Sequence, residues 1–331
     1  MSDIDIVIPW VDGGDVEWQK EFKRWRARCT GRDDNSEIRY RDWGSLQYLF
    51  RGIEKFAPWV RKVHLITTGQ RPEWLNMEAP KLNFVKHEDF IPGVWLPTFS
   101  VRPIELNLHR IEGLSERFVY FNDDYFLLRP VKEERFFKGG VPCDMAILDT
   151  LPIKSDRAHM VMNDMRLVYG HFDKWETLRR DPWKWFNLRY GGQLMRTLAL
   201  MPFEIFPGLR NHHLPQAFLK STYREVWQAE GELLSEVSGH RFRDITDVNQ
   251  YVFRYWQLLS GGFRPINIVY DSARYEISER QIDKLCSTIR HQRRDILVTY
   301  DTDKIEDFET LKNRVNSAFE SILPERSSFE K

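Results

Sequence analysis

Short apolar runs of strand length alternate with segments of helical periodicity in the first half of the sequence. The strand-like runs cover residues 4–10, 62–67, 82–85, 117–121 and 144–148. Between them, apolar residues recur at helical spacing over residues 15–28, 46–56 and 103–113. Strands that alternate with helices favour a mainly parallel sheet covered by those helices. We therefore expect an α/β fold.

The composition changes near residue 150, where a stretch rich in Trp, Met and Arg begins. We expect helices to continue from there through about residue 234. Beyond it, the pattern predicts a helix over residues 248–259, a strand over 266–270 and two helices over 278–292 and 303–321. The expected organisation is an α/β core over residues 1–150 and a mainly helical region over 151–331 that returns to the core near residues 264–270.

The charges of the 331-residue chain cancel, with 49 Lys and Arg against 49 Asp and Glu. Without an excess of cations, the whole chain has no electrostatic basis for binding a phosphate backbone, so we expect no nucleic-acid partner. The three cysteines, Cys29, Cys143 and Cys286, are far apart and lack the spacing of metal ligands. This usage fits a reducing compartment rather than a disulfide scaffold or a zinc module.

The N-terminal residues carry two acids, Asp3 and Asp5, and no basic segment ahead of the first apolar run, so we expect no signal peptide. Nor does any apolar stretch reach the roughly 18 residues of a membrane span. We expect a cytoplasmic protein. A basic stretch over residues 20–32 most simply forms an exposed helix face. The alternative is attraction to anionic lipid or to an anionic polymer.

Asn122, Asp123 and Asp124 directly follow an apolar strand-like run. Open α/β sheets bind ligands at the carboxyl ends of their strands. Two adjacent carboxylates there suit Mg²⁺, which binds proteins through one or two carboxylates together with substrate phosphates and water. A solvated turn is the alternative, because Asn and Asp also favour turns.

The first strand-like run ends in Asp12-Gly13-Gly14-Asp15. Glycine has no Cβ, so the backbone here could approach a nucleotide closely. The segment lacks the spacing of a Walker loop or a dinucleotide fingerprint, and a plain strand-to-helix turn is the alternative.

Arg39, Arg41 and Asp42 precede the second helical segment. An arginine fork in this position could grip a diphosphate while Asp42 caps the helix. A solvated charge cluster explains the same residues equally well.

Two i, i+4 pairs carry charge on expected helices. Glu105 and His109 share a helix face, and Arg243 and Asp247 open the segment over 248–259. Each pair could be an ordinary helix-surface contact, which for an ion pair contributes only about 0.3–0.5 kcal/mol.

His212 and His213 stand just before Pro215. Because the ordinary pKa of histidine lies near neutrality, one of them could act as a general base. A lone histidine is more often structural.

Taken in order, several segments resemble the Stealth protein family. They are IDIVIPWVDGGD (4–15), the run from RYRDWG to PEWLN (39–76), HEDFIP (87–92), LPTFSVRPIELNLHRIEGLSERFVYFNDDYFL (96–127) and HHLPQAFLK (212–220). A further segment, FRPINIVYDS (263–272), fits loosely. The family includes bacterial capsule-polysaccharide phosphotransferases and the catalytic part of the lysosomal-enzyme N-acetylglucosamine-1-phosphotransferase.

The resemblance implies transfer of hexose 1-phosphate or N-acetylhexosamine 1-phosphate from a UDP-sugar to a hydroxyl of a polysaccharide or lipid-linked glycan. A phosphodiester forms and UMP is released, in capsule or exopolysaccharide synthesis. The resemblance also implies a GT-A-like, Rossmann-like nucleotide-binding sheet over residues 1–150 and a requirement for Mg²⁺ or Mn²⁺. The location it implies is cytoplasmic, with peripheral contact at the inner face of the bacterial membrane left open.

The resemblance assigns roles to residues at matching positions. Asp123 and Asp124 would hold the metal, Glu105 would lie in the active site, His213 would be the base and Arg243 would bind phosphate. The nucleotide would be held by Trp10, Val11, Asp12, Gly13, Arg39 and Asp42.

Other functions remain open on the sequence alone. A metal-dependent GT-A-like glycosyltransferase would use the same aspartates but break the sugar C–O bond and release UDP. A non-catalytic carbohydrate-binding subunit would bind without turnover. The Trp- and Arg-rich region over residues 150–210 either contacts the acceptor, since aromatic faces stack on sugars, or packs as an ordinary helical core.

Overall fold

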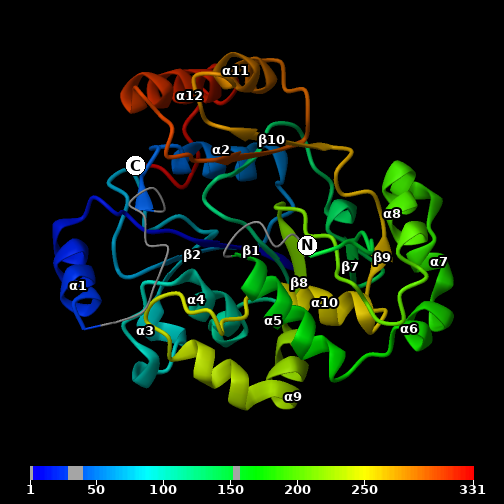
Figure 1. Cartoon of the computed structure of the whole chain (residues 1–331). Coiled ribbons are helices and arrows are strands. Elements are labelled where there is room, and N and C mark those ends of the chain that lie inside the picture. The colour runs from blue at the N-terminus through cyan, green and yellow to red at the C-terminus, as the bar shows by residue number, and fades with distance from the viewer. Residues whose placement is uncertain (1–2, 29–39, 152–156) are drawn as a thin grey trace.

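A five-stranded sheet lies at the centre of the computed structural model, which describes residues 3–28, 40–151 and 157–331 (Figure 1). Its strand order is β3-β2-β1-β4-β8, the first four strands being parallel and β8 antiparallel to β4. The strands are β1 (Ile4–Pro9), β2 (Val63–Thr67), β3 (Leu82–Lys86), β4 (Arg117–Tyr120) and β8 (Gln216–Leu219). The order of the four parallel strands is that of a Rossmann-type sheet.

The strands of this sheet are apolar almost throughout because both of its faces are covered. In β1, Ile4, Ile6 and Ile8 point into one hydrophobic cluster and Val7 points into the other. This alternation is the period of two expected of a strand. Continuous apolar runs are typical of parallel strands buried on both faces, which explains why they stand out in the sequence.

Different layers cover the two faces of the sheet (Figure 1). On one side lie α2 (Leu46–Phe56), α11 (Ile282–Arg290), α12 (Phe308–Ile322) and a second sheet of order β10-β11-β5. The strands of that sheet are β5 (Tyr125–Leu127), β10 (Ser272–Glu276) and β11 (Ile296–Tyr300). On the other side lie α4 (Val101–Asn107), α5 (Arg157–Tyr169), α9 (Lys220–Ser238) and α10 (Tyr251–Leu259).

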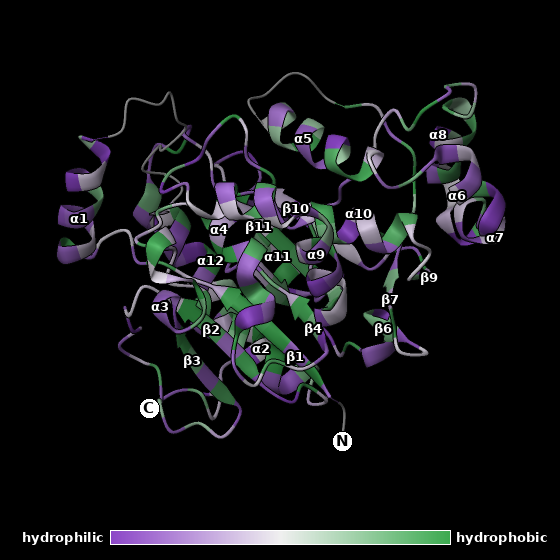
Figure 2. Cartoon of the chain, turned by 90° about the horizontal axis from the view of Figure 1, so that it is seen from below, coloured by the Kyte–Doolittle hydropathy of each residue, from purple (hydrophilic) through white to green (hydrophobic). Residues whose placement is uncertain are grey.

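Smaller elements complete the molecule. α1 (Val16–Arg26) lies at one end, and α6 (Lys174–Arg180), α7 (Pro182–Trp185), the 3₁₀-helix η5 (Leu188–Gln193) and α8 (Leu194–Ala199) lie at the other. A third sheet contains β6 (Phe137–Lys138), β7 (Val141–Asp144) and β9 (Arg264–Pro265), and α3 (His87–Phe90) follows β3. Figure 2 shows apolar residues concentrated in the central strands. None of the helices in the described part of the chain is both long and apolar enough to cross a membrane.

The structure confirms the α/β class and the first four strands of the central sheet, but it corrects several later elements. The strand expected over 144–148 ends at Asp144, and beyond it only an isolated bridge joins Leu148 to Leu209. β8 interrupts the helical stretch expected through residue 234 and joins the central sheet. The strand expected over 266–270 is absent, because the chain there crosses from β9 to β10. The division near residue 150 stays a prediction.

Two helix boundaries also differ from expectation. α4 begins at Val101, where Ser100 accepts a hydrogen bond from the Arg102 amide, and it ends at Asn107 rather than near residue 113. α10 begins at Tyr251 rather than at residue 248. The residues between α9 and α10 therefore form a loop, and this loop carries Arg243.

Candidate active site

The carboxyl ends of β1 and β4 lie side by side where the strand order of the central sheet reverses. β1 pairs with β2 on one side and with β4 on the other. Open α/β sheets bind their ligands at such a switch point. The loop over residues 10–15 leaves β1 there, and Asn122, Asp123 and Asp124 leave β4. Both loops that the sequence singled out therefore open onto one edge of the sheet.

The antiparallel pairing of β8 with β4 brings a histidine to the same edge. Gln216 at the start of β8 lies opposite Tyr120 at the end of β4, so His213 comes next to the loop after β4. The His213 Nε2 atom lies 3.6 Å from Asp124 Oδ2, and 43% of the His213 side chain is exposed. His213 is thus anchored beside a carboxylate while part of its ring still faces solvent.

Tyr125 orients His213 from the buried side. The Tyr125 Oη and His213 Nδ1 atoms are 3.1 Å apart, and the two rings meet edge to face. Burial, followed by the charge of Asp124, raises the pKa of Tyr125 well above its ordinary value. The phenol therefore stays protonated and can donate to Nδ1 or accept from it.

Two adjacent carboxylates, Asp123 and Asp124, lie at this edge and suit a cation. The Oδ1 atom of Asp124 is buried and has no hydrogen-bond partner among the described residues. Desolvation, followed by the negative charges of Asp124 and Asp42, raises the pKa of Asp123, although part of its side chain reaches solvent. An unpartnered carboxylate oxygen and mutual repulsion are both relieved by a bound divalent ion.

The described side chains alone do not form a complete coordination shell for a metal ion. Within the described residues, no group of three or more His, Cys, Asp or Glu side chains converges as a metal site. Two carboxylates with the remaining positions left to substrate and water are nevertheless the usual arrangement for Mg²⁺. Asp123 and Asp124 therefore fit the divalent ion that the sequence led us to expect.

Glu105 lies beneath the site rather than in its opening. It is 4% exposed, and its Oε1 atom accepts a hydrogen bond of 2.8 Å from Tyr120 Oη. Turned so that its nitrogen faces the carboxyl group, the Gln250 side chain donates to Oε2 at 2.8 Å. Burial raises the pKa of Glu105 to about 7, against the lowering effect of Arg102 and Arg243. Glu105 is a buried carboxyl group close to the loop that carries Arg243.

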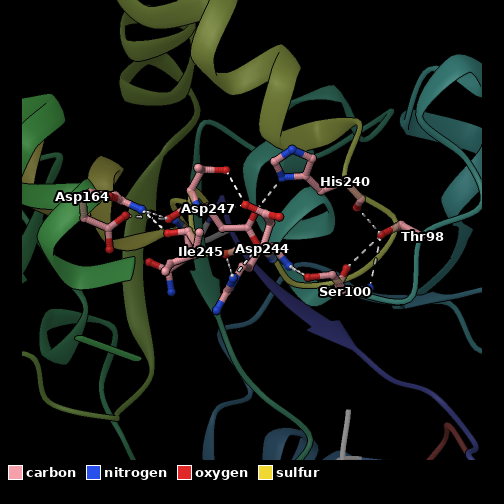
Figure 3. Close-up of polar contacts among 11 residues, drawn as sticks. Thr98, Ser100, Asp164, His240, Asp244, Ile245 and Asp247 are labelled. Atoms are coloured by element: carbon pink, nitrogen blue, oxygen red, sulfur yellow. Dashed lines mark hydrogen bonds and ion pairs between the residues drawn. The ribbon is translucent and has the colours of Figure 1, made fainter. Parts of the chain in front are cut away.

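A buried polar network holds the Arg243 loop in place (Figure 3). Asp247 is fully buried and accepts from Arg102, from His240 Nδ1 at 2.7 Å and from the Asp244 amide at 2.9 Å. The Phe99 amide donates to the Arg241 carbonyl at 2.7 Å. The loop before α10 is thereby tied to the loop before α4.

Arg243 and Asp247 do not lie on one helix as predicted, because both residues precede α10. Asp247 instead neutralises Arg102 and His240. The prediction that Glu105 and His109 share the face of one α-helix is also wrong. α4 ends at Asn107, and His109 packs against the rings of Tyr223 and Trp227.

The loop after β1 uses its amides within the protein. The Trp10 amide donates to Ile66 and the Gly13 amide to Tyr40, while the Asp12 amide donates to the side chain of Gln70. A Cβ on Gly13 would lie 2.2 Å from the Tyr40 carbonyl oxygen. Close packing of two protein segments, rather than approach to a nucleotide, accounts for this glycine. Val11 is half-buried beside it.

The segment before α2 is held by the C-terminal part of the chain. Arg41 pairs with Asp301 at 3.2 Å, and the indole nitrogen of Trp43 donates to the same carboxylate. Asp42 does not cap α2, since the N-cap residue is Ser45 and Asp42 Oδ1 accepts from the Gly44 amide. Arg39, the other predicted nucleotide ligand of this segment, lies outside the described residues.

The structure brings His213 and Asp124 together, with Asp123 and Asp42 near enough for their charges to interact, and it places Arg243 near Glu105. The sequence patterns did not predict that Tyr125, Gln70, Asp301 and His240 contact residues of this region. Tyr125 could have been noticed, because it directly follows Asp124. Asp301 gave no signal, since its contacts with Arg41 and Trp43 join residues about 260 positions apart.

Comparison with known proteins identifies relatives over the full length of the chain. The family description "Stealth protein CR2, conserved region 2" matches residues 39–143. The capsular polysaccharide phosphotransferase WcwK of Streptococcus pneumoniae is 38% identical, the alignment covering 100% of this chain and 99% of the relative. The exopolysaccharide phosphotransferase cps2G of Lactiplantibacillus plantarum is 36% identical, with 99% and 96% covered. The receptor polysaccharide phosphotransferase WefC of Streptococcus gordonii is 38% identical, with 99% and 98% covered.

Solved structures are more distant. The galactosyltransferase LgtC, in complex with donor and acceptor sugar analogues, is 10% identical with a TM-score of 0.38, and the alignment covers 95% of each chain. The bifunctional glycosyltransferase WbbM is 9% identical with a TM-score of 0.37, covering 97% of this chain and 51% of that one. Similarity at this level supports no conclusion about this chain.

Proposed function

We propose that this chain, which belongs to the Stealth family of capsular and exopolysaccharide phosphotransferases, transfers a sugar 1-phosphate from a UDP-sugar to a glycan hydroxyl. The reaction forms a phosphodiester and releases UMP, in capsule or exopolysaccharide synthesis. The observation that carries the proposal is the position of His213 Nε2, 3.6 Å from Asp124 Oδ2 at the switch point of the sheet. A general base beside a carboxylate, at the edge where α/β sheets bind ligands, suits the activation of a hydroxyl nucleophile.

In the proposed reaction, His213 removes the proton of the attacking hydroxyl. Tyr125 Oη accepts from Nδ1–H, which leaves the Nε2 lone pair free for that proton. The hydroxyl oxygen forms a bond to the β-phosphorus while the bond from this phosphorus to the α,β-bridging oxygen breaks. UMP leaves with the electron pair, and the sugar C–O bond stays intact. Asp124 Oδ2 then stabilises the imidazolium.

Asp123 and Asp124 would hold the divalent ion, Mg²⁺ or Mn²⁺. Among the described residues, Asp124 Oδ1 has no hydrogen-bond partner while Oδ2 faces His213, so one oxygen could bind the ion and the other could face the imidazole. When bound, such an ion offsets negative charge on the phosphoryl oxygens. Asp42 contributes further negative charge at the same place.

Arg243 is proposed to bind the transferred phosphate. It lies close enough to Glu105 to lower the pKa of that carboxyl group. An arginine supplies a fixed planar set of donors, which suits phosphate oxygens. Because Glu105 is buried, its proposed role is to position groups of the site rather than to contact the sugar.

The proposed nucleotide site is formed by Trp10, Val11, Asp12 and Gly13 with Arg39 and Asp42. Three of the four amides of the first loop already have protein partners, so recognition would fall on side chains and carbonyl groups. The donor is proposed to be a UDP-sugar, and the acceptor a polysaccharide or lipid-linked glycan inside the bacterial cell. The relatives' names support a polysaccharide acceptor.

The experiment that tests the proposal separates the nucleotide products. The purified protein is incubated with Mg²⁺, a panel of UDP-sugars and a glycan acceptor, and the products are resolved by anion exchange. We expect UMP from the wild type. His213→Ala should lower turnover by about 10²- to 10⁴-fold with UDP-sugar affinity nearly unchanged. His291→Ala is the control, because His291 is exposed and its ring bonds to Ser287 within its own turn of helix.

Three other results would contradict parts of the proposal. Release of UDP in place of UMP would favour the glycosyltransferase alternative. Binding of UDP-sugar without either product, with every donor and acceptor, would favour a non-catalytic carbohydrate-binding role. A His213→Ala variant with wild-type turnover would remove His213 from the mechanism.

A further inference from the structure

A cluster of aromatic side chains connects the loop after β1 to the loop that carries Arg243. Its buried members are Trp18, Phe99 and Phe242, and Val11, Phe22, Trp25 and Tyr40 pack around them. These residues come from four segments of the chain, around positions 11–25, 40, 99 and 242. The cluster therefore forms only when the folded chain brings these loops together.

Tyr40 joins the loop after β1 to the segment before α4. Its carbonyl oxygen accepts a hydrogen bond of 3.1 Å from the Gly13 amide. Its hydroxyl group donates to the Phe99 carbonyl, also at 3.1 Å. Tyr40 thus holds the first loop through its backbone and the segment before α4 through its side chain.

Phe99 continues the connection from Tyr40 to the loop before α10. Its amide donates to the Arg241 carbonyl at 2.7 Å. Its ring stacks on the ring of Phe242, with the centroids 5.2 Å apart and an angle of 16° between the planes. Arg243 is the next residue. An unbroken series of contacts therefore leads from the loop after β1 to the residue that precedes Arg243.

α1 supports the same contacts. Asp15, at the end of the first loop, caps this helix by accepting from the Trp18 amide at 2.7 Å. The rings of Trp18 and Phe22 meet the Phe99 ring edge to face, with centroids 5.8 and 5.3 Å away. Edge-to-face contacts of this kind favour one relative orientation of the rings. The helix that follows the first loop therefore also fixes the position of Phe99.

We propose that Tyr40 and Phe99, which we call the aromatic bridge, are positioning residues that fix the separation between the nucleotide and the β-phosphate of the bound donor. This inference rests on the proposed function, in which residues 10–13 hold the nucleotide and Arg243 binds the transferred phosphate. A misplacement of about 1 Å far from the reacting atoms can lower an enzyme's rate about 10²-fold. Two loops that bind parts of one diphosphate therefore need a fixed separation, which the aromatic bridge provides without contacting the donor.

Calorimetric titration of the full chain with UMP and with UDP, both with Mg²⁺, tests the proposal, because only UDP carries a β-phosphate. Tyr40→Phe removes one hydroxyl group and should weaken UDP binding about three- to tenfold while UMP binding stays unchanged. Tyr190→Phe is the matched control, since it also loses a hydrogen bond from a hydroxyl group to a carbonyl, that of Lys184. Phe99→Leu should show the same selective loss as Tyr40→Phe. Its control is Phe329→Leu, because Phe329 is also buried but packs in a different hydrophobic cluster.

A double-mutant cycle shows whether Tyr40 acts through Arg243. Arg243→Ala alone should weaken UDP binding, and adding Tyr40→Phe to it should cause little further loss. The proposal is overturned if Tyr40→Phe binds UDP like the wild type or weakens UMP and UDP binding equally. It is also overturned if the full effect of Tyr40→Phe persists in the Arg243→Ala background.

Failure of the aromatic bridge and failure of the proposed reaction give different results. Release of UMP by the wild type together with unchanged UDP binding in Tyr40→Phe would overturn the aromatic bridge alone. Release of UDP in place of UMP, with the selective loss present in Tyr40→Phe, would support the aromatic bridge and reject only the phosphotransfer reaction. A wild type that binds UDP no more tightly than UMP would overturn the aromatic bridge, because Arg243 would then contribute nothing to binding of the β-phosphate.

Discussion

His212 and His213 are adjacent in the chain, but one is buried and the other is half-exposed. His212 is 5% exposed, and burial together with Arg254 and Arg210 lowers its pKa to about 3. It therefore stays neutral and cannot exchange protons with a substrate near neutral pH. His213 is half-exposed, and its Nε2 atom lies 3.6 Å from Asp124 Oδ2. The strand start at Gln216 determines which histidine reaches the site.

The hydroxyl group of Tyr125 is expected to matter more than its ring. Tyr125→Phe keeps the edge-to-face contact with His213 but removes the partner of Nδ1. Without that partner the imidazole is no longer held in the tautomer that exposes a basic Nε2. We expect turnover to fall about tenfold with the KM for UDP-sugar little changed, and the acidic limb of the pH–rate profile to move. An unchanged pH profile would contradict the orienting role.

Glu105 makes folding stability depend on pH. Burial raises its pKa from 4.5 to about 7 in the folded protein, so the folded state holds a proton that the unfolded state releases. Stability contributed by the protonated form is complete below pH 4.5 and is lost as pH rises toward 7. The loss should amount to roughly 1–3 kcal/mol.

Glu105→Gln isolates this effect, because the amide retains an acceptor for Tyr120 but cannot ionise. Urea unfolding followed between about pH 5 and 7 should show a smaller loss of stability in the variant than in the wild type. Parallel stability curves for the two proteins would show that Glu105 does not titrate in this range.

Among the secondary-structure elements, long and strongly patterned segments could be predicted and short ones could not. β1, β2 and α2 follow from their own apolar patterns, since each buries most of its residues. β5 has only three residues, and β8 has four that lead directly into α9. Their identity as strands depends on partners elsewhere in the chain. β5 pairs with β11 and β8 pairs with β4, and these pairings bring Tyr125 and His213 together. The contact between the two residues could therefore not be predicted from their positions in the sequence.

The loop before α10 depends on one buried carboxylate for its conformation. Asp247→Asn would leave Arg102 and His240 without their counter-charge in a buried network. Breaking a buried ion pair from one side costs about 3–5 kcal/mol. We expect that loss in urea unfolding, together with weaker binding of substrate phosphate through a displaced Arg243.

Asp244→Asn is the matched control for this loop. Asp244 is exposed three residues away, and its side chain accepts hydrogen bonds from the amide and hydroxyl groups of Thr246. Its replacement should cost less than about 1 kcal/mol. Equal losses for Asp244→Asn and Asp247→Asn would contradict the importance of the buried network.

On the scale of the whole molecule, three parts of the fold converge on one edge. The parallel strands supply Asp123 and Asp124, the antiparallel strand β8 supplies the position of His213, and the loop between α9 and α10 supplies Arg243. The second sheet holds this arrangement from behind, because the Thr299 amide in β11 donates to the Asp124 carbonyl at 3.0 Å. The proposed active-site residues therefore come from several segments of the chain.

The most direct test of the account follows the β-phosphorus of the donor. The protein is incubated with Mg²⁺, the glycan acceptor and a UDP-sugar labelled with ³²P at the β-phosphate. We predict that the label appears in the glycan as a phosphodiester, that unlabelled UMP is released, and that Asp124→Ala abolishes both. Retention of the label in released UDP would show that the sugar C–O bond breaks, which would contradict the phosphotransfer mechanism.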